Sequence, residues 1–387
     1  MKAIKKTILL LFTIAGLILA SGCNKNDTPE PERELLALFF AISDNIEPED
    51  NYHGILVIDA NTMNALKILK SDNFFNSIEL SSDNKTWYVI SSSYLDYDSF
   101  FLQAIDSQTG SVTKEVEVNN PKMALSKNSE VFVVYGDENK GMQFVDKNTF
   151  EIMHEENTYE VFQQDTFYTN VKVAAFSPDD KLYYGRYNKI YEYDINEFTI
   201  TQEFPIQGET SHNLRLSDIN ISPDGKNVYV TTTYFSQGAF FSIEIASGKF
   251  NFYHAGYDSQ IAVSPDGRHV YITDPAALPC AYDAYPIPTN KVLRYDVKAE
   301  TMETFIEGVD ELGLINGIIL TSYPQVEPDN KYLYMVLWSR KYTADGNPVD
   351  IVKINVETKE IVDYYELPKN WYGCMISGIK IGKYKTR

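Results

Sequence analysis

One unit of about fifty residues recurs along this chain, and that repeat constrains the fold more than any other feature. Its two clearest copies, 219–231 and 261–273, each place an apolar stretch before Ser-Pro-Asp-Gly and a Val-Tyr run after it. Weaker copies bring the total to seven. Short apolar runs separated by turn residues indicate an all-β unit of four strands, and a repeated unit of that kind closes into a ring of blades, a β-propeller.

We label the predicted strands of each unit a to d in chain order. The turn between a and b carries Pro, Asp and Gly or Asn, as in Ser177–Lys181 and Glu327–Lys331, and these residues favour tight hairpins. Strand b is apolar or aromatic at successive positions, as in Val131–Tyr135. That pattern is typical of a strand buried on both faces.

Strand c of each unit ends in an apolar residue followed by an acid or an amide. These polar residues are Asp59, Asp106, Asp146, Asp194, Glu244, Asp296 and Asn355. The five aspartates of this set, Asp59, Asp106, Asp146, Asp194 and Asp296, recur at an equivalent place before a turn. We therefore expect them to form side-chain-to-backbone hydrogen bonds rather than to act in catalysis.

The two ends of the repeat are complementary. The first unit has candidate b, c and d strands from Ala37 onward but no strand a, and 375–382 has the pattern of a strand a with no strand b after it. The sequence therefore predicts that the C-terminal strand becomes the inner strand of the first blade, which removes open sheet edges. The predicted domain is a seven-bladed β-propeller of four-stranded antiparallel blades over 35–387.

The Ser-Pro-Asp-Gly-Lys and Val-Tyr-Val-Thr segments of 222–231 resemble the YVTN-type β-propeller repeats of bacterial surface and secreted proteins. The repeat is also similar to the seven-bladed lactonase-like fold and to WD40-like rings, although the Trp-Asp signature of WD40 repeats is absent. This resemblance covers nearly the whole chain after its first residues. It implies a fold and leaves the activity open, because propellers serve many functions.

The first 22 residues have the composition of a signal peptide. Three lysines lie among the first six residues, and the apolar stretch 7–20 that follows is too short for a comfortable membrane span. The segment Leu19–Cys23 is similar to a bacterial lipoprotein box, with its Leu one position further from Cys23 than usual. The resemblance implies cleavage before Cys23 and attachment of lipid, including palmitate, to this residue, which anchors a chain without spanning the membrane. The alternative is an ordinary secretory signal with a chance cysteine.

Residues 23–34 are rich in Asn, Asp, Pro and Glu and are predicted to form a flexible tether. The tether favours the outer membrane of a bacterial envelope, with the periplasmic and the surface-facing orientations both open. The chain has 34 Lys and Arg against 54 Asp and Glu, a net charge of −20, which argues against nucleic acid as a partner. Cys280 and Cys374 are expected to remain unpaired, although the compartment permits a disulfide.

The connections from d to a and from b to c are longer than the other turns, so we expect function at the rim where they gather. The longest are 157–170, 208–217, 274–290, 308–323, 339–350 and 368–373. These connections hold aromatic residues that can stack on sugar rings or flat ligands. The aromatic candidates are Tyr94, Tyr97, Phe167, Tyr168, Tyr234, Tyr257, Tyr282, Tyr285, Tyr342, Trp371 and Tyr372. The alternative is that these rings fill gaps between blades.

Two basic pairs stand out against the acidic background: His212 with Arg215, and Arg340 with Lys341. They are candidates for binding an anionic ligand. The alternative is an ion pair with a nearby rim aspartate, which is a common surface feature.

No spacing in the sequence identifies a catalytic or metal site. The five histidines are scattered, and there is no nucleophile elbow, phosphate loop or Cys-x-x-Cys. Oxygen donors at Asp96, Asp98 and 345–350 do not match an EF-hand loop. We therefore predict no catalytic residue, no metal and no cofactor.

Three hypotheses follow for the function. In the first, a non-catalytic binding lipoprotein captures a glycan or a metal chelate at the aromatic rim and passes it to an outer-membrane transporter. In the second, the rim docks a protein partner in an envelope complex; a flat rim favours this hypothesis, whereas a deep central pocket favours the first. The third, a lactonase-like hydrolase, rests on resemblance of fold and requires acids or histidines that converge at the mouth of the central channel.

Overall fold

The computed structural model describes residues 33–43, 53–92, 99–136, 141–156, 171–186, 188–206, 215–234, 237–256, 259–274, 291–307, 314–315, 321–343, 348–367 and 375–386. The chain divides into a large unit, Leu35–Tyr384, and a small unit of Met1–Glu34 with Lys385–Arg387. Within the small unit, the Thr386 amide donates to the Arg33 carbonyl at 3.0 Å. No helix in the described ranges is long and apolar enough to cross a membrane.

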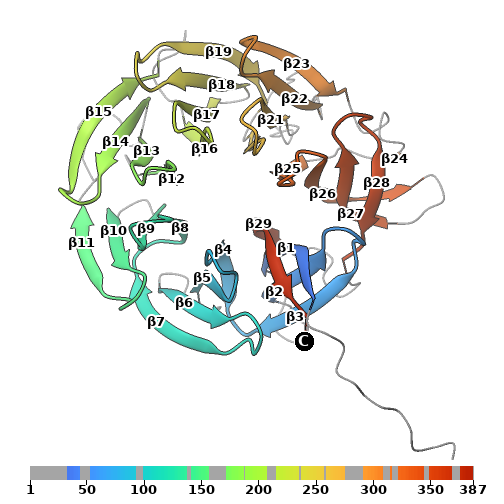
Figure 1. Ribbon diagram of the computed structural model, residues 1–387, viewed down its shortest axis with the longest axis horizontal. Coiled ribbons are helices and arrows are strands. Elements are labelled where there is room, and N and C mark those ends of the chain that lie inside the picture. Colours follow the sequence, from blue (N-terminus) through green and yellow to red (C-terminus); the bar gives the residue numbers. More distant parts are fainter. Residues whose placement is uncertain are drawn as a thin grey trace, which may run out of the picture. The chain divides into compact units, whose positions relative to one another are not determined.

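The large unit is all β, and the described strands form seven antiparallel sheets arranged in a ring (Figure 1). The innermost strands, one from each blade, are the a strands β29 (Met375–Lys385), β4 (Phe74–Leu80), β8 (Lys122–Leu125), β12 (Val173–Phe176), β16 (Arg215–Ile221), β20 (Ile261–Val263) and β25 (Thr321–Val326). The b strands are β1 (Glu34–Ser43), β5 (Thr86–Ser92), β9 (Val131–Tyr135), β13 (Leu182–Arg186), β17 (Asn227–Tyr234), β21 (His269–Asp274) and β26 (Tyr332–Thr343).

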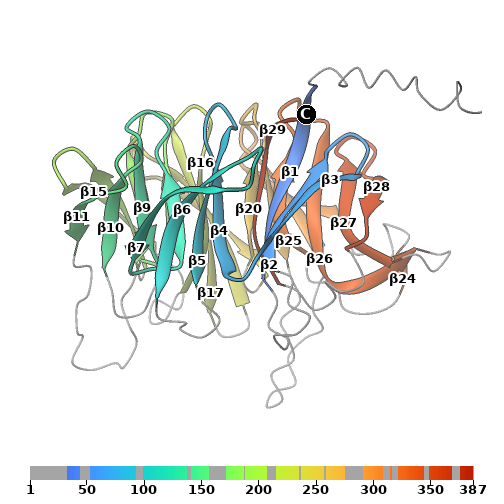
Figure 2. The ribbon, with the colours of Figure 1, turned by 90° about the horizontal axis from the view of Figure 1, so that it is seen from below.

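The c and d strands complete each blade outward from the axis. The c strands are β2 (His53–Asp59), β6 (Phe100–Asp106), β10 (Met142–Asp146), β14 (Lys189–Asp194), β18 (Gln237–Glu244), β22 (Lys291–Asp296) and β27 (Pro348–Asn355). The d strands are β3 (Ala65–Ser71), β7 (Val112–Val118), β11 (Ile152–Glu156), β15 (Thr199–Pro205), β19 (Phe250–Ala255), β23 (Thr301–Ile306) and β28 (Ile361–Tyr365). Figure 2 shows the strands running between two rims of the ring.

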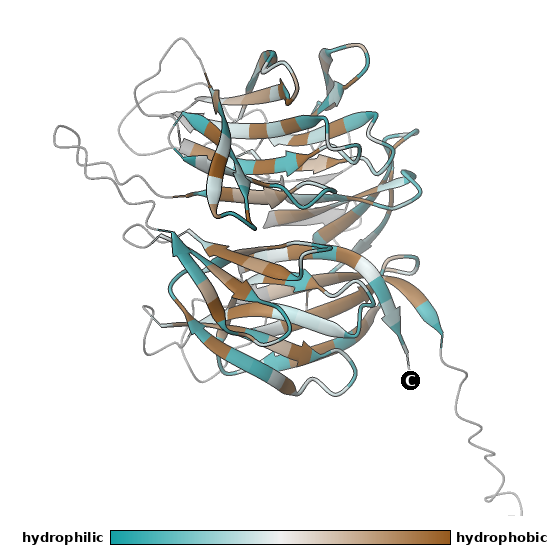
Figure 3. Cartoon of the chain, turned by 60° about the vertical axis from the view of Figure 1, so that its left-hand side comes forward, coloured by the Kyte–Doolittle hydropathy of each residue, from teal (hydrophilic) through white to brown (hydrophobic). Residues whose placement is uncertain are grey.

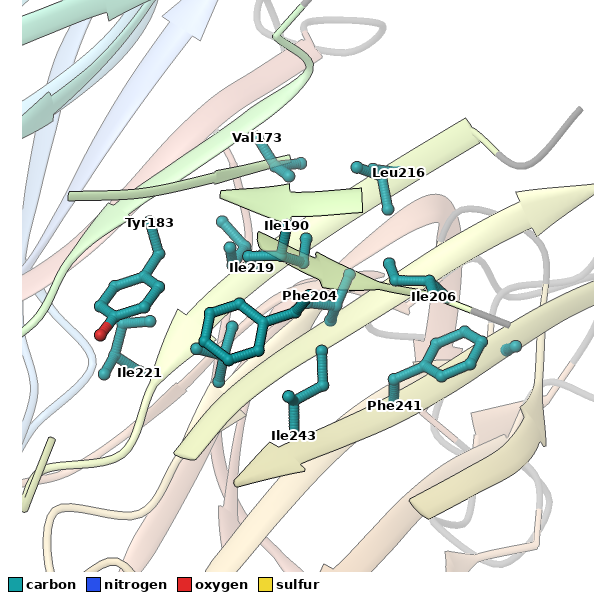
Figure 4. Packing of buried hydrophobic residues seen from close by; sticks show 13 residues of the cluster. Val173, Tyr183, Ile190, Phe204, Ile206, Leu216, Ile219, Ile221, Phe241 and Ile243 are labelled. Atoms are coloured by element: carbon teal, nitrogen blue, oxygen red, sulfur yellow. The ribbon is translucent and has the colours of Figure 1, made fainter. Parts of the chain in front are cut away.

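The core lies between neighbouring blades, because each sheet packs a face against the next. The central strands β2 and β9 are buried along their whole length, whereas the outer strand β7 is mostly exposed. Figure 4 shows one such interface, where Phe204 and Tyr183 of one blade meet Ile219, Ile221 and Phe241 of the next. Hydrophobic residues are accordingly spread through the blades in view in Figure 3. The burial of the b strands on both faces, predicted from their composition, is confirmed.

The predicted closure is confirmed: β29 pairs with β1, so the C-terminal strand is the inner strand of the first blade. The seam between the last blade and the first is also linked by buried hydrogen bonds to the carbonyl of Ala60. The Lys353 ammonium donates to it at 2.7 Å and the Tyr334 hydroxyl at 2.9 Å. The seam is therefore joined by polar contacts as well as by packing.

The repeated acids are structural, as predicted. Asp106 accepts hydrogen bonds from the Thr109 and Gln108 amides at 2.6 and 3.1 Å, and Asp194 accepts one from the Asn196 amide at 2.8 Å. These bonds lower the pKa of both carboxyls.

The a–b turns repeat a second hydrogen bond. The Ser222 hydroxyl donates to Asp224 at 2.7 Å, and Gly225 takes a φ of +70° that completes the turn. The equivalent bonds join Ser81 to Asp83, Ser177 to Asp179 and Ser264 to Asp266.

The last blade departs from this repeat because Glu327 occupies the serine position. Its carboxyl is buried, and burial together with the neighbouring Asp329 raises its pKa to about 7.

Strands extend into three segments that the sequence predicted to be long loops. β16 begins at Arg215, β26 continues to Thr343, and the short strand β24 (Leu314–Ile315) pairs with the end of β26 as a fifth strand of the last blade. The hairpin of β26 and β27 resumes pairing at Lys341↔Val349 after a register shift, and this explains its length. Asp350, considered as a calcium ligand, lies in β27 and accepts the Leu367 amide at 2.7 Å, so its carboxylate has a structural bond.

Candidate functional site

A channel of about 710 Å³ runs through the centre of the ring. Its walls are formed by residues from all seven a strands, which surround the axis in Figure 1. This volume lies in the range of small-molecule binding sites. The a strands position the site, because one face of each packs between blades and the other faces the axis.

The wall of the channel is largely polar, which follows from the alternation of side chains along each a strand. In β16, Leu216, Ile219 and Ile221 are buried and belong to the hydrophobic cluster between blades. Ile219 and Ile221 also border the channel, and Asp218 and Asn220 supply its polar groups on this strand. Other neutral polar groups in the wall are Asn76, Ser77, Gln260, Gln325 and Ser377.

Bulges in three a strands alter which side chains face the axis. The ladder of β16 with β17 shifts between Leu216 and Asp218, and that of β4 with β5 shifts between Phe75 and Ser77. In β25 the shift lies at Tyr323, whose φ of +50° is unusual for a residue other than glycine. Bulges of this kind redirect side chains and occur often beside functional sites.

Asp218 is the channel residue with the most unusual environment. Its Oδ1 accepts the Ile219 amide at 2.8 Å, and its Oδ2 accepts the Ile261 amide of the next blade, also at 2.8 Å. Asp218 is half-buried in the channel wall, and burial raises its pKa to about 6, against the opposing effect of the two amides and of Lys122 and Lys380. This carboxyl therefore binds and releases a proton within reach of neutral pH.

Lysines and tyrosines complete the polar wall around Asp218. The Lys380 ammonium forms an ion pair with Glu79 at 2.7 Å, and the Lys122 ammonium donates to the Lys172 carbonyl at 3.4 Å. The Tyr135 hydroxyl donates to the Ala174 carbonyl at 3.4 Å.

Burial is also the main cause of the raised pKa of both channel tyrosines. It raises the pKa of Tyr135, and it raises the pKa of Tyr323 to about 12. Both rings therefore keep their protons at neutral pH and remain hydrogen-bond donors.

The ligand-binding candidates predicted from the sequence lie outside the residues whose side chains the structure describes. Arg215, Tyr234, Arg340 and Tyr342 are in strands β16, β17 and β26, with only their backbone described. Outside the described residues altogether are Tyr94, Tyr97, Phe167, Tyr168, His212, Tyr257, Tyr282, Tyr285, Trp371 and Tyr372, together with Cys23, Cys280 and Cys374. Their proposed roles stay predictions.

The sequence analysis missed the channel residues, although a signal for them exists. Counting four positions back from the residue that begins each a–b turn gives one residue in each of the six blades that have such a turn: Ser77, Lys122, Val173, Asp218, Gln260 and Tyr323. All of these except Val173 line the channel. Aligning the repeats on their turns would therefore have identified most of the wall.

Among the described residues, no group of three or more His, Cys, Asp or Glu side chains is placed to hold a metal ion. The channel can hold a ligand by hydrogen bonds and by the charges of its lysines and carboxyls.

Comparison with known proteins identifies the fold and no more. No protein-family model matches the chain, and no curated protein matches it. A proposed 6-phosphogluconolactonase from Bacteroides uniformis is similar over 90% of this chain and 99% of its own, with a TM-score of 0.60 and 14% identity. A second one, from Bacteroides fragilis, is similar over 92% and 100%, with a TM-score of 0.60 and 13% identity. The Swd1 β-propeller domain of Myceliophthora thermophila is similar over 79% and 96%, with a TM-score of 0.53 and 11% identity.

Proposed function

We propose that this chain is a cell-envelope lipoprotein whose propeller is a non-catalytic binding module for a small ligand. The ligand enters at the rim where the d–a and b–c connections lie, and its polar part is held in the central channel. The observation that carries the proposal is the 710 Å³ polar channel, since a deep central pocket was the feature expected of a small-ligand binder.

The binding part of this proposal is tested by thermal shift. The chain from residue 24 onward is screened against glycans, metal chelates, free metals and lactones, and a saturable rise in melting temperature is expected from one class, because ligand binding to the native state stabilises it. The rise should be lost in Gln325→Leu, which lines the channel, and kept in the matched variant Gln202→Leu on the outer strand β15.

A panel that gives no shift contradicts small-ligand binding. The scaffold hypothesis then takes its place, and a pull-down from membranes with the same chain is the next experiment.

The envelope part of the proposal has its own test. Cells that express the full chain are fed an alkyne analogue of palmitate, and label is expected on the wild type but not on Cys23→Ser. Label that persists in Cys23→Ser, or its absence from both, contradicts lipid attachment at Cys23 without affecting the binding proposal.

A further inference from the structure

The charge of the channel wall differs in sign from the charge of the chain. Among the described lining residues, three lysines, Lys122, Lys127 and Lys380, stand beside two carboxyls, Glu79 and Asp218. The whole chain instead has 54 Asp and Glu against 34 Lys and Arg. A basic excess inside an acidic protein is a local feature that selects for the charge of a ligand.

Both carboxyls of the wall already have partners. Glu79 is neutralised by Lys380 at 2.7 Å, and each oxygen of Asp218 accepts a backbone amide at 2.8 Å. A cationic ligand would have to compete with these partners for the carboxyls, and the lysines of the wall would repel it. An anionic ligand meets lysines and amide or hydroxyl donors without displacing either carboxyl.

Lys122 is the lysine best placed to receive an anion. Lys380 is paired with Glu79, and Lys127 lies in the turn that follows β8, whereas Lys122 is the first residue of β8 and lies close enough to Asp218 to influence that group. Its ammonium also donates to the Lys172 carbonyl at 3.4 Å. A lysine ammonium binds a carboxylate more strongly than a neutral carbonyl, since a hydrogen bond between opposite charges is shorter and stronger.

The neutral part of the wall narrows the class of ligand further. Gln325 offers an amide donor and a carbonyl acceptor, and Ser77 offers a hydroxyl. Three further amides have one end engaged: Asn76 donates to the Ser92 hydroxyl, Asn220 accepts the Ile221 amide and Gln260 accepts the Tyr323 amide. Their other ends keep hydrogen-bonding capacity. Paired donors and acceptors of this kind suit a ligand that carries several hydroxyl groups.

On the basis of the proposed binding function, we infer that the channel takes a hydroxyl-rich small molecule with a carboxylate, such as a uronic acid, and that Lys122 binds the carboxylate. The hydroxyl groups of the ligand form hydrogen bonds with the amide side chains of the wall. The carboxylate accepts a hydrogen bond from the Lys122 ammonium.

The inference is tested with three ligands of one skeleton: galacturonate, galactose and galactosamine, which are anionic, neutral and cationic. Calorimetric titration of the chain from residue 24 onward should show binding of galacturonate. Galactose and galactosamine should bind at least about ten-fold more weakly, which is the effect of one hydrogen bond to a charged group.

The role of Lys122 is tested by substitution. Lys122→Met, which keeps the aliphatic stem, should reduce galacturonate affinity about ten-fold or more. The matched variant Lys114→Met, on the exposed strand β7, should not. Thermal melts of both variants establish that they fold.

Several results would overturn the inference. Equal affinity for galactose or galactosamine would remove the charge preference, and an unchanged affinity in Lys122→Met would remove the role of this lysine; both leave small-ligand binding intact. If none of the three sugars binds, the uronate class is wrong, and the wider thermal-shift panel separately decides whether any small ligand binds.

Discussion

The carboxyls of the turns and the carboxyl of the channel are the same chemical group, but their pKa values are shifted in opposite directions. Turn acids such as Asp106 and Asp224 are partly exposed and accept hydrogen bonds that lower their pKa. Asp218, enclosed by the ring, has its pKa raised to about 6 by burial. The turn acids recur from blade to blade, whereas the positions equivalent to Asp218 hold Ser, Lys, Val, Gln and Tyr. In a repeat protein, a recurring polar residue maintains the fold, and a position that varies while facing a cavity is where a binding site is built.

The largest expected effect separates the face of an a strand that packs between blades from the face that lines the channel. Ile219→Ala removes a side chain packed between two blades, and we expect it to reduce the free energy of unfolding by about 2–5 kcal/mol. Gln325→Ala, on the channel face of β25, should cost about 0.5 kcal/mol or less. Urea denaturation measures both, and equal losses would contradict the division into a structural and a functional face.

The next prediction concerns Glu327, which takes the serine position of the a–b turn in the last blade. The pKa of Glu327 is raised from 4.5 to about 7, so its contribution to stability is present below pH 4.5 and is lost as the pH rises through 7. The neutral isostere Glu327→Gln should therefore be more stable than the wild type above pH 7, by on the order of 2–3 kcal/mol. The two proteins should converge near pH 4.5. Thermal melts across this pH range make the measurement, and a constant difference at all pH values would show that ionisation of Glu327 is not the cause.

A smaller loss of stability is expected in the turn of Ser222 and Asp224, which keeps the repeated hydrogen bond. Asp224→Ala removes the acceptor of the Ser222 hydroxyl and of the Lys226 amide, which should cost about 1 kcal/mol at pH 7. Because the pKa of Asp224 is lowered by these bonds, the stability they contribute is present above pH 3.8 and is lost as the pH falls through the folded-state pKa. Urea midpoints at pH 7 and pH 3 should show the difference between the two proteins shrinking in acid. A difference that grows in acid would reverse the assigned sign.

The smallest effect is one on ligand affinity rather than on stability. Protonation of Asp218 as the pH falls through about 6 removes a negative charge from the channel, so the wild type should bind galacturonate more tightly at pH 5 than at pH 7.5. We expect a factor on the order of ten, the interaction of two unit charges about 12 Å apart at an effective dielectric constant of about 20. Asp218→Asn should bind with nearly the same affinity at both pH values. A pH response that survives in Asp218→Asn would assign it to another group.

The fold was readable from the sequence because turn chemistry and apolar runs are local properties. The Ser-Pro-Asp-Gly turn before Val228, the buried pattern of Val131–Tyr135 and the unpaired strand pattern near Met375 were sufficient for the blade count and the closure. The site was not readable in the same way. Ser217 is an extra residue in β16 that changes which side chains face the axis, and Asp218 finds a partner in Ile261, a residue of the next blade.

The charged wall also depends on distances that no local pattern encodes. Lys380 and Glu79 come from opposite ends of the sequence and meet because β29 closes the ring beside β4. Alignment of the repeats on their turns would have placed Lys122, Asp218 and Gln260 at one level of the channel. It would not have shown that burial raises the pKa of Asp218, since that requires the surrounding ring.

The measurement that tests the central claim most directly is a crystal structure of the chain from residue 24 onward with the ligand that gives the strongest thermal shift. The account predicts ligand density inside the channel, within hydrogen-bonding distance of side chains from several a strands, Lys122 and Gln325 among them. Density bound elsewhere on the ring, with the channel wall untouched, would contradict it.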